Sequence, residues 1–397
     1  MAVPVKSNIM WIGKTDWELR KFHGDEYSTH RGSTYNSYLI REEKTVLIDT
    51  VWKPFAQEFV TNLRKIIPLE KIDYVIANHA ESDHSGALPD LMKHIPEKPI
   101  YCSQNGIKSL KGHYHQDWNF IPIKTGQRLS IGPGKDLIFI EAPMLHWPDS
   151  MMEYLTGDHV LFSNDAFGQH YATEYLFNDL VNQDELFSEA IKYYANILTP
   201  FSKLVKSKID EFVQLNLPLD IICTSHGVIW RNNPMQIVQK YLDWSQQYKE
   251  NQITLIYDTM WNGTRVMAEN IAKGIQATDS KVNIKIFNSA KTDKNDLVTE
   301  VFRSNMIGIG SPTVNKGILT SVAALLEELR GLGFKDKKAF AFGTYGWNSE
   351  SVKIISENLK NAGFSVVTDG LKLQWMPNDD ESTEKAIEFG KGLKEYF

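Results

Sequence analysis

The sequence predicts an α/β protein of two domains, in which an α+β domain precedes a doubly wound parallel sheet. Three observations support this fold class. The chain has 397 residues, more than one compact core usually accommodates. Short apolar runs recur irregularly in the first part, and from residue 253 onward they alternate regularly with helical patterns. We place the domains at 1–250 and 251–397, joined near the polar segment 243–252.

The composition is that of an ordinary globular protein and argues against several classes of function. Hydrophobic residues make up 42% of the chain, charged residues make up 23%, and the net charge is -6, which disfavours a nucleic-acid partner. We find no apolar run long enough to cross a bilayer and no secretory leader. The two cysteines do not make a disulfide framework, so we expect a reduced, cytoplasmic protein without a membrane partner.

The first domain is predicted to contain layered sheets with helices outside. Residues 34–50 indicate a hairpin, because charged residues separate two apolar β-branched runs. Five later apolar runs are too short for helices and end in polar or turn residues: KIDYVIANH, KPIYCS, KDLIFIEAP, HVLFSND and LDIICTSH. Sheets covered by helices bury runs of this kind.

The second domain is predicted from five successive strand–helix units. Its strands lie in the segments ITLIYD, VNIKIFN, NMIGIGSP, KKAFAFGTYG and SVVTDGLKLQW, and a helical pattern follows each one. Strict alternation of this kind is typical of a doubly wound, five-stranded parallel sheet.

Side chains that bind metals follow several strand ends of the first domain. The loop NHAESDHSG supplies four of them, and three later strand ends supply one each. The set is His79, Glu81, Asp83, His84, His146, Asp165 and His226. A single strand-end His or Asp is usually a loop residue, but strand ends at one edge of a sheet converge, so the set predicts a metal site. If the loop is extended, its alternate residues project to one side.

The residue types favour a particular metal chemistry. Seven groups exceed the needs of one ion, so we predict a binuclear site. Four histidines and three carboxylates are not the thiolate-rich set of structural zinc. Mixed imidazole and carboxylate ligands with open positions suit iron. Three carboxylates leave two divalent ions with a charge of +1, and carboxylates stabilise the higher oxidation state, so the site can cycle, as zinc cannot.

Three loops of the second domain predict a phosphate and flavin site. YDTMWNGT follows the first strand and opens a helix, whose N-terminal amides make an anion cradle. GSPTVNKG and GTYGWNSES end the third and fourth strands, beside the switch point where such sheets bind ligands. If the aromatic residues do not merely cap the sheet edge, they flank a planar ring. The predicted FMN contacts are Thr259, Met260, Trp261, Asn262, Gly263, Thr264, Ser311, Pro312, Thr313, Asn315, Tyr345, Gly346 and Trp347.

The order His-x-x-x-Asp-His, then His, Asp and His, resembles the metallo-β-lactamase superfamily. With Glu81 in place of a second histidine, and with the segments MLHWPDSM and NDAFGQH, the chain resembles flavodiiron proteins. The resemblance implies a metallo-β-lactamase-like αββα sandwich followed by a flavodoxin-like domain. It implies one iron held by His79, Glu81 and His146, and a second held by Asp83, His84 and His226. It also implies that Asp165 bridges the two and that a distal pocket is lined by His23, Tyr193 and Tyr194.

The two sites together lead us to expect a flavodiiron oxidoreductase. A two-electron flavin and two ferrous ions hold the four electrons that take O2 to two waters, and two electrons take two NO molecules to N2O and water. Lacking a CxxC pair, the chain is expected to receive electrons from a separate rubredoxin-like or deazaflavin donor. The family implies a head-to-tail homodimer or a dimer of dimers.

Two other readings remain open from the residues. One is a zinc hydrolase with a flavodoxin-like binding module, which metal analysis would distinguish. The other is an electron carrier whose first domain is a structural relic, which predicts that His84→Ala or Asp165→Ala leaves all activity unchanged.

Overall fold

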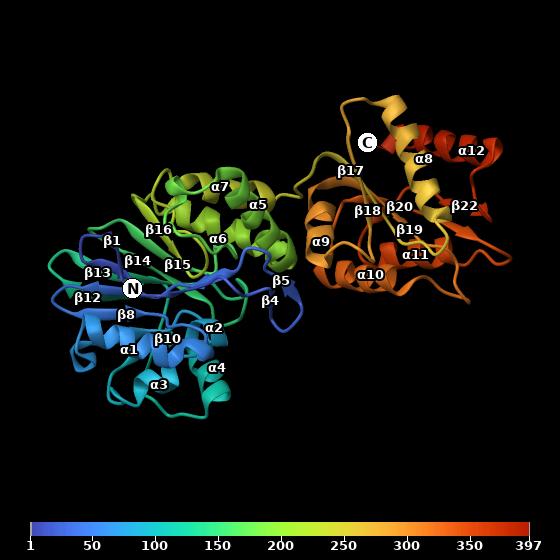
Figure 1. Ribbon diagram of the computed structural model, residues 1–397. Coiled ribbons are helices and arrows are strands. Elements are labelled where there is room, and N and C mark those ends of the chain that lie inside the picture. The colour runs from blue at the N-terminus through green and yellow to red at the C-terminus, as the bar shows by residue number, and fades with distance from the viewer. Residues whose placement is uncertain (1, 397) are drawn as a thin grey trace. The chain divides into compact units, whose positions relative to one another are not determined.

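The computed structural model describes residues 2–396, which form two compact units (Figure 1). One unit contains the chain up to Tyr194 together with Phe201–Asp243. The other contains Ala195–Pro200 and the chain from Trp244 onward. No helix among residues 2–396 is long and apolar enough to span a membrane.

The first unit is built on two sheets. The seven-stranded sheet has the order β1 (Val3–Lys6), β2 (Ile9–Trp11), β7 (Tyr38–Arg41), β8 (Thr45–Ile48), β9 (Tyr74–Ile76), β10 (Ile100–Ser103) and β11 (Phe120–Ile123). The five-stranded sheet has the order β12 (Arg128–Gly132), β13 (Lys135–Glu141), β14 (Met151–Leu155), β15 (Val160–Asn164) and β16 (Ile221–Thr224). The predicted hairpin is confirmed, since β7 and β8 pair antiparallel with Tyr38 opposite Ile48.

Helices cover the outer faces of both sheets (Figure 1). One group consists of α1 (Ala56–Ile66), α2 (Ser82–Ser85), α3 (Leu88–Met92) and α4 (Gln104–Tyr114), and the other of α5 (Gln183–Tyr193), α6 (Ser202–Gln214) and α7 (Met235–Trp244). Two small two-stranded sheets complete the unit: β3 (Lys14–Asp16) pairs with β6 (Ser33–Tyr35), and β4 (Lys21–Phe22) pairs with β5 (Tyr27–Ser28). The predicted layered α+β domain is therefore confirmed.

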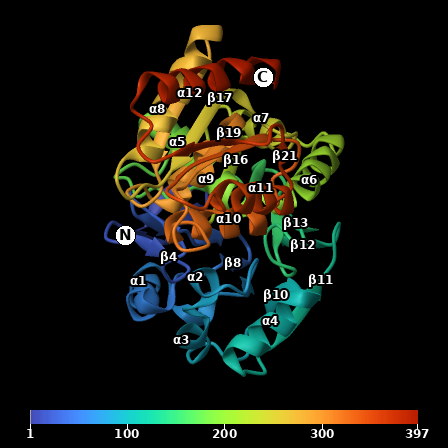
Figure 2. The ribbon, with the colours of Figure 1, turned by 90° about the vertical axis from the view of Figure 1, so that its right-hand side faces the viewer.

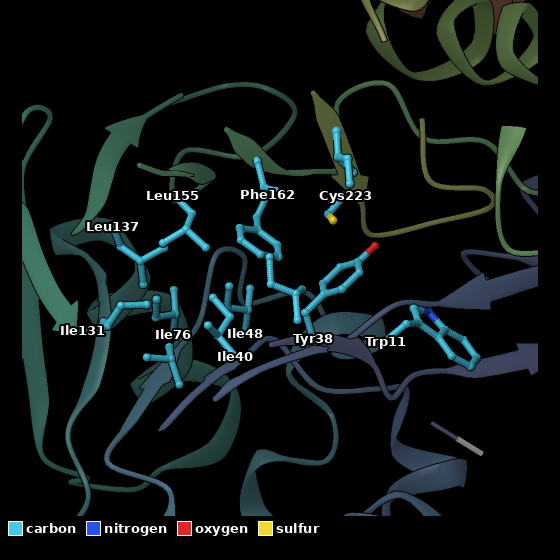
Figure 3. Close-up of a cluster of buried hydrophobic side chains, with 14 of the residues drawn as sticks. Trp11, Tyr38, Ile40, Ile48, Ile76, Ile131, Leu137, Leu155, Phe162 and Cys223 are labelled. Atoms are coloured by element: carbon cyan, nitrogen blue, oxygen red, sulfur yellow. The ribbon is translucent and has the colours of Figure 1, made fainter. Parts of the chain in front are cut away.

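The core of the first unit lies between the two sheets. Ile40, Ile48 and Ile76 point from the seven-stranded sheet toward Leu155 and Phe162 of the other sheet (Figure 3). All of these side chains are at most 2% exposed. Burying an aliphatic or aromatic side chain of this size contributes about 1.5–3 kcal/mol, so the contact fixes the strands whose ends carry the metal-binding residues.

The second unit is a parallel sheet in the order β18 (Asn283–Asn288), β17 (Glu250–Tyr257), β19 (Ser304–Gly310), β20 (Lys338–Tyr345) and β21 (Ser365–Val366), with β22 (Leu371–Gln374) also pairing with β20. The predicted doubly wound parallel sheet is confirmed. Its last strand differs from the prediction, because a turn at Gly370, where φ is +82°, divides SVVTDGLKLQW into β21 and β22.

Helices lie on both faces of this sheet, with α8 (Gly263–Thr278) and α12 (Asp380–Gly392) side by side (Figure 2). The others are α9 (Lys294–Arg303), α10 (Thr320–Leu332) and α11 (Ser351–Asn361). Met267, Ile271 and Ile275 form the buried stripe of α8 at a spacing of four residues. A Cβ at Gly274 would lie 2.0 Å from the Ile387 carbonyl oxygen, so the glycine allows α8 and α12 to approach closely.

Candidate metal centre and cofactor pocket

The loop after β9 carries the first four predicted metal ligands. His79 and Glu81 precede α2, whereas Asp83 and His84 lie within its single turn. The one-sided projection that an extended loop would give therefore does not apply to Asp83, which lies in the helical turn. The helical turn directs Asp83 and His84 to the same cluster from a different angle, because successive residues on a helix project about 100° apart.

The other three ligands come from later strand ends of the same unit. His146 lies between β13 and β14, Asp165 directly follows β15, and His226 follows β16. The structure brings all seven predicted residues together. Atoms of His79, Glu81 and His146 lie within 4.8 Å of one another, as do atoms of Asp83, His84 and His226.

Asp165 lies between these two groups and contacts both. Its Oδ1 is 3.2 Å from His84 Nε2 and 3.5 Å from His226 Nε2. Its Oδ2 is 3.5 Å from His146 Nε2 and 3.9 Å from His79 Nε2. One carboxylate thus presents one oxygen to each group, which is the geometry that a bridging ligand requires.

The buried polar atoms of the cluster fit a pair of metal ions. Both carboxylate oxygens of Asp83 and of Asp165 and both ring nitrogens of His84 are buried and make no hydrogen bond within residues 2–396. Buried polar atoms are normally satisfied, so such a concentration of them requires another partner. Divalent cations satisfy carboxylates and imidazoles together.

The pKa values indicate how strongly the acids attract positive charge. Burial lowers the pKa of His84, but the charges of Asp83 and Asp165 outweigh it and raise that pKa to about 10. His79 behaves alike: burial opposes protonation, yet hydrogen bonds to Asp149 and Glu81 hold its pKa well above the usual range. Histidine must be deprotonated to bind a metal, so metal binding to this cluster releases protons.

Outer contacts orient the ligands. The His226 Nδ1 nitrogen lies 2.6 Å from the Thr34 carbonyl oxygen, to which it donates, so Nε2 is left to face the carboxylates. Asp149 Oδ2 accepts a hydrogen bond from the Ala80 amide at 2.7 Å and lies 3.3 Å from His79 Nδ1. Sequence reasoning missed Asp149, although a carboxylate three residues after His146 was a usable signal.

Below the metal loop, two buried carboxyl groups share one amide. Asp49 accepts hydrogen bonds from the Asn78 backbone N–H at 2.8 Å and from Asn78 Nδ2 at 3.1 Å. Asn78 Nδ2 also lies 3.2 Å from Glu153 Oε1. Burial raises the pKa of Asp49 to about 6, and burial with the charge of Asp49 raises that of Glu153 well above its usual range. Both shifts favour the neutral form of these carboxyl groups.

The three residues predicted for the distal pocket do not lie together. His23 Nε2 lies 3.0 Å from Glu81 Oε1, and the Tyr193 ring lies 6.4 Å from the His226 ring. Tyr194 instead directs its hydroxyl to Ser202 Oγ at 3.1 Å and packs against Tyr241. We therefore remove Tyr194 from the predicted pocket. The buried ring of His170, 4.9 Å from that of His226, is a neighbour that sequence reasoning missed.

The second unit contains a cavity of about 540 Å³ at the ends of β17, β19 and β20. Ten predicted contacts line it: Thr259, Met260, Trp261, Gly263, Pro312, Thr313, Asn315, Tyr345, Gly346 and Trp347. Trp261 and Trp347 are 82% and 90% exposed at its rim. Such aromatic side chains at a sheet edge suit a planar ring system.

Three predicted contacts do not line the cavity, and several unpredicted ones do. Thr264 Oγ1 bonds to Thr344 Oγ1 at 3.1 Å, and Ser311 Oγ bonds to the Leu319 amide at 3.0 Å. Asn262 begins α8 in the left-handed conformation, with φ of +66°. The missed lining residues are Val314, Thr344, Asn348, Trp375 and Met376. Trp375 and Met376 follow β22, beyond the segments used for the prediction.

Comparisons with known proteins agree with both units. A model described as ODP family beta lactamase matches residues 34–227, and a Flavodoxin model matches residues 255–390. The anaerobic nitric oxide reductase flavorubredoxins of Escherichia coli O1:K1 and Shigella boydii serotype 4 are 57% identical over 99% of this chain and 82% of their own length.

Two solved structures cover all of this chain with TM-scores of 0.94. They are the flavodiiron protein of Giardia intestinalis, 32% identical with 96% of that chain covered, and the rubredoxin oxygen:oxidoreductase of Desulfovibrio gigas, 33% identical with 99% covered.

The fold and the two sites are those of a flavoprotein oxidoreductase in which a flavodoxin domain follows a β-lactamase-like domain. The chain belongs to the flavodiiron protein family, whose cofactors are FMN and a non-haem pair of iron ions.

Proposed function

We propose that this protein reduces NO to N2O at a diiron centre, with electrons relayed through FMN from a rubredoxin-type donor. The 57% identical relatives named nitric oxide reductases support this substrate. Reduction of O2 to water is the second candidate, supported by the 33% identical rubredoxin oxygen:oxidoreductase. The observation that carries the proposal is the cluster of seven buried or half-buried ligands in two groups that share Asp165.

The first unit would hold the metals through the assignment that the family implies. One ion would be held by His79, Glu81 and His146, the other by Asp83, His84 and His226, and Asp165 would be shared between them. When bound, the iron pair supplies open positions for a diatomic molecule and two electrons. The three carboxylates leave the pair with a charge of +1, which keeps oxidation and reduction of the centre within reach.

His23 and Tyr193 are the proposed pocket residues of this centre. Burial and the nearby carboxylates, Asp165 first, raise the pKa of Tyr193 well above its usual range. Its hydroxyl therefore keeps its proton at neutral pH and is available as a hydrogen-bond donor. His23 Nε2, at 3.0 Å from Glu81 Oε1, orients that carboxylate.

The cavity of the second unit would hold FMN. The loop at Thr259–Gly263 and the N-terminus of α8 suit the phosphate. Tyr345, Trp347 and Trp375 suit the isoalloxazine ring, since Trp and Tyr stack on flat conjugated systems. We also propose the head-to-tail homodimer, or dimer of dimers, that the family implies, and analytical ultracentrifugation would test it.

The decisive experiment is anaerobic reduction of the holoprotein, then stopped-flow mixing with NO and, separately, O2. We expect NO to reoxidise flavin and iron in seconds and to yield one N2O for every two NO consumed. If neither gas reoxidises both cofactors, the proposal is wrong. Two zinc ions per chain, no iron and an intact esterase activity would favour the hydrolase alternative instead.

A further inference from the structure

A series of aromatic rings leads away from the metal centre within the first unit. The Trp147 indole lies 4.9 Å from the His79 ring in an edge-to-face arrangement and 6.4 Å from the His146 ring. It thus contacts two side chains of one proposed iron group. Its own indole nitrogen is not part of the ligand set.

The series continues along α4 to the following loop. The His113 ring stacks on Trp147 at 6.0 Å with planes 24° apart. The Tyr114 ring is 6.1 Å from that of His113, and the Trp118 ring is 5.8 Å from that of Tyr114. We call Trp147, His113, Tyr114 and Trp118 the aromatic track.

The aromatic track reaches the solvent at His113. The His79 side chain is fully buried, Trp147, Tyr114 and Trp118 are half-buried, and His113 is exposed. The track therefore joins a buried proposed ligand to the solvent. By contrast, the rings around His226 are enclosed, since Phe22, Tyr35 and Tyr193 are at most 7% exposed.

The Tyr114 hydroxyl also has a hydrogen-bond acceptor for its proton. It lies 2.7 Å from Ser85 Oγ, and the Ser85 hydroxyl donates to the Ala80 carbonyl oxygen at 2.6 Å. Tyr114 O–H is consequently the donor in the first bond. Tyrosine and tryptophan are among the side chains most easily oxidised by one electron, and loss of that electron releases the O–H or N–H proton.

We propose that the aromatic track supplies single electrons to the metal centre when O2 meets reduced iron after the flavin is exhausted. The inference rests on the proposed function. Complete reduction of O2 to two waters takes four electrons and four protons. Two ferrous ions supply two electrons and become ferric, and Trp147 and Tyr114 supply one electron and one proton each. Solvent supplies the other two protons, and a thiol or ascorbate in solution then re-reduces the two rings where the track meets the solvent, at His113 and the half-buried Trp118.

The track would protect the centre from its own substrate. Without it, the missing electrons would be taken from the side chains nearest the iron, including His79 and His146. Loss of the track should therefore leave the fully reduced enzyme competent and damage the partly reduced one.

The test uses the holoprotein reduced anaerobically with two electron equivalents per chain, its flavin oxidation followed by absorbance. The sample is mixed with excess O2 and frozen for EPR. We expect an organic radical that changes shape when the protein is grown with ring-deuterated tyrosine or tryptophan. Trp147→Phe should lower its yield at least five-fold and increase oxidised products in the peptide 78–86 by mass spectrometry.

Tyr74→Phe is the matched control, because Tyr74 is half-buried in the same unit and pairs with Tyr101 at 5.5 Å, outside the track. It should leave the yield unchanged. If Trp147→Phe loses iron, Trp118→Phe replaces it as the test, since no proposed ligand contacts Trp118, and the radical should then decay more slowly with ascorbate.

Equal radical yield in wild type and an iron-loaded Trp147→Phe variant would overturn the inference, as would unchanged decay with ascorbate in Trp118→Phe or a radical insensitive to both deuterated residues. Fully reduced samples run in parallel distinguish failure of the proposed function from failure of the aromatic track. If they do not react with O2, the O2 candidate function fails, and if they react but no ring radical forms in the partly reduced sample, only the track fails.

Discussion

The metal centre of the first unit and the cofactor cavity of the second are built by different means. The metal centre gathers buried side chains, each directed by outer contacts such as the one from His226 to the Thr34 carbonyl. The cavity is formed by three loops, and its largest side chains, Trp261 and Trp347, are mostly exposed. Binding at the metal centre should therefore depend mainly on the identity of the side chains. Binding in the cavity should depend on the loop backbone as well.

Replacing the shared ligand should produce the largest effect. Asp165→Ala removes an oxygen from each iron group, so we expect iron content to fall below one per chain and NO reduction to fall at least 100-fold. Metal analysis and N2O yield measure this. Asp136→Ala changes a half-buried carboxylate of the same unit that pairs with Arg128, and it should change neither quantity. An active Asp165→Ala protein would remove the site from consideration.

A smaller loss should follow from changing an orienting residue. Asp149→Asn keeps the size of the side chain but removes the charge that faces His79 and the Ala80 amide. Outer-shell changes typically cost about 10–100-fold in metal affinity, and we expect a loss in that range. Competition with a chelator measures it, and unchanged iron affinity would show that the backbone alone holds His79.

The flavin site should respond less to any single side chain. Trp347→Ala should weaken FMN binding by about 1 kcal/mol, roughly five-fold, because one aromatic contact is removed while the loops remain. Fluorescence titration of the flavin-free protein measures the Kd, with Trp17→Ala, at an exposed position of the first unit, as the control. A loss of FMN affinity of several hundred-fold would contradict the expectation that no single side chain dominates binding in the cavity.

Glu153→Gln should alter stability and leave activity nearly unchanged. Burial raises the pKa of Glu153 in the folded state, so its contribution to stability is complete below the unfolded pKa and is lost as pH rises toward the folded pKa. The loss amounts to about 1 kcal/mol per pH unit within that window. Gln does not titrate, so the variant should gain on wild type as pH rises above the unfolded pKa of Glu153.

Hydrogen exchange of peptides from β13–β15 in the metal-free protein would measure this difference. Parallel pH profiles for wild type and Glu153→Gln would mean that Glu153 is ionised in the folded protein. Tyr154→Phe, at the neighbouring outward position, carries no carboxyl group and should retain the wild-type pH profile.

The same contrast explains how much could be predicted from the sequence. The seven ligands are signalled by residue type at strand ends, and all seven come together. The local path of their loop was not predictable, because Ser82–Ser85 turns into a helix only against its tertiary neighbours. Tyr194 was misjudged since adjacent residues on a helix point about 100° apart, and sequence proximity to Tyr193 does not bring it to the site.

The cavity was harder to predict residue by residue. Thr264 and Ser311 lie within the right loops, yet their hydroxyls bond to the protein itself. Trp375 was missed because the strand before it was taken as one continuous segment, whereas the turn at Gly370 separates β22 from β21. The sequence therefore predicted which loops form the cavity. It did not predict every residue that lines the cavity, because that depends on the backbone geometry of each loop.

The position of Asp165 has a consequence for assembly of the centre. Since one oxygen faces each group, an ion in either group fixes the carboxylate in the orientation that the other group needs. Filling of one position then strengthens binding at the other by the same factor in both directions. At limiting iron, chains carrying two ions or none should outnumber chains carrying one, so maturation of the enzyme proceeds cooperatively.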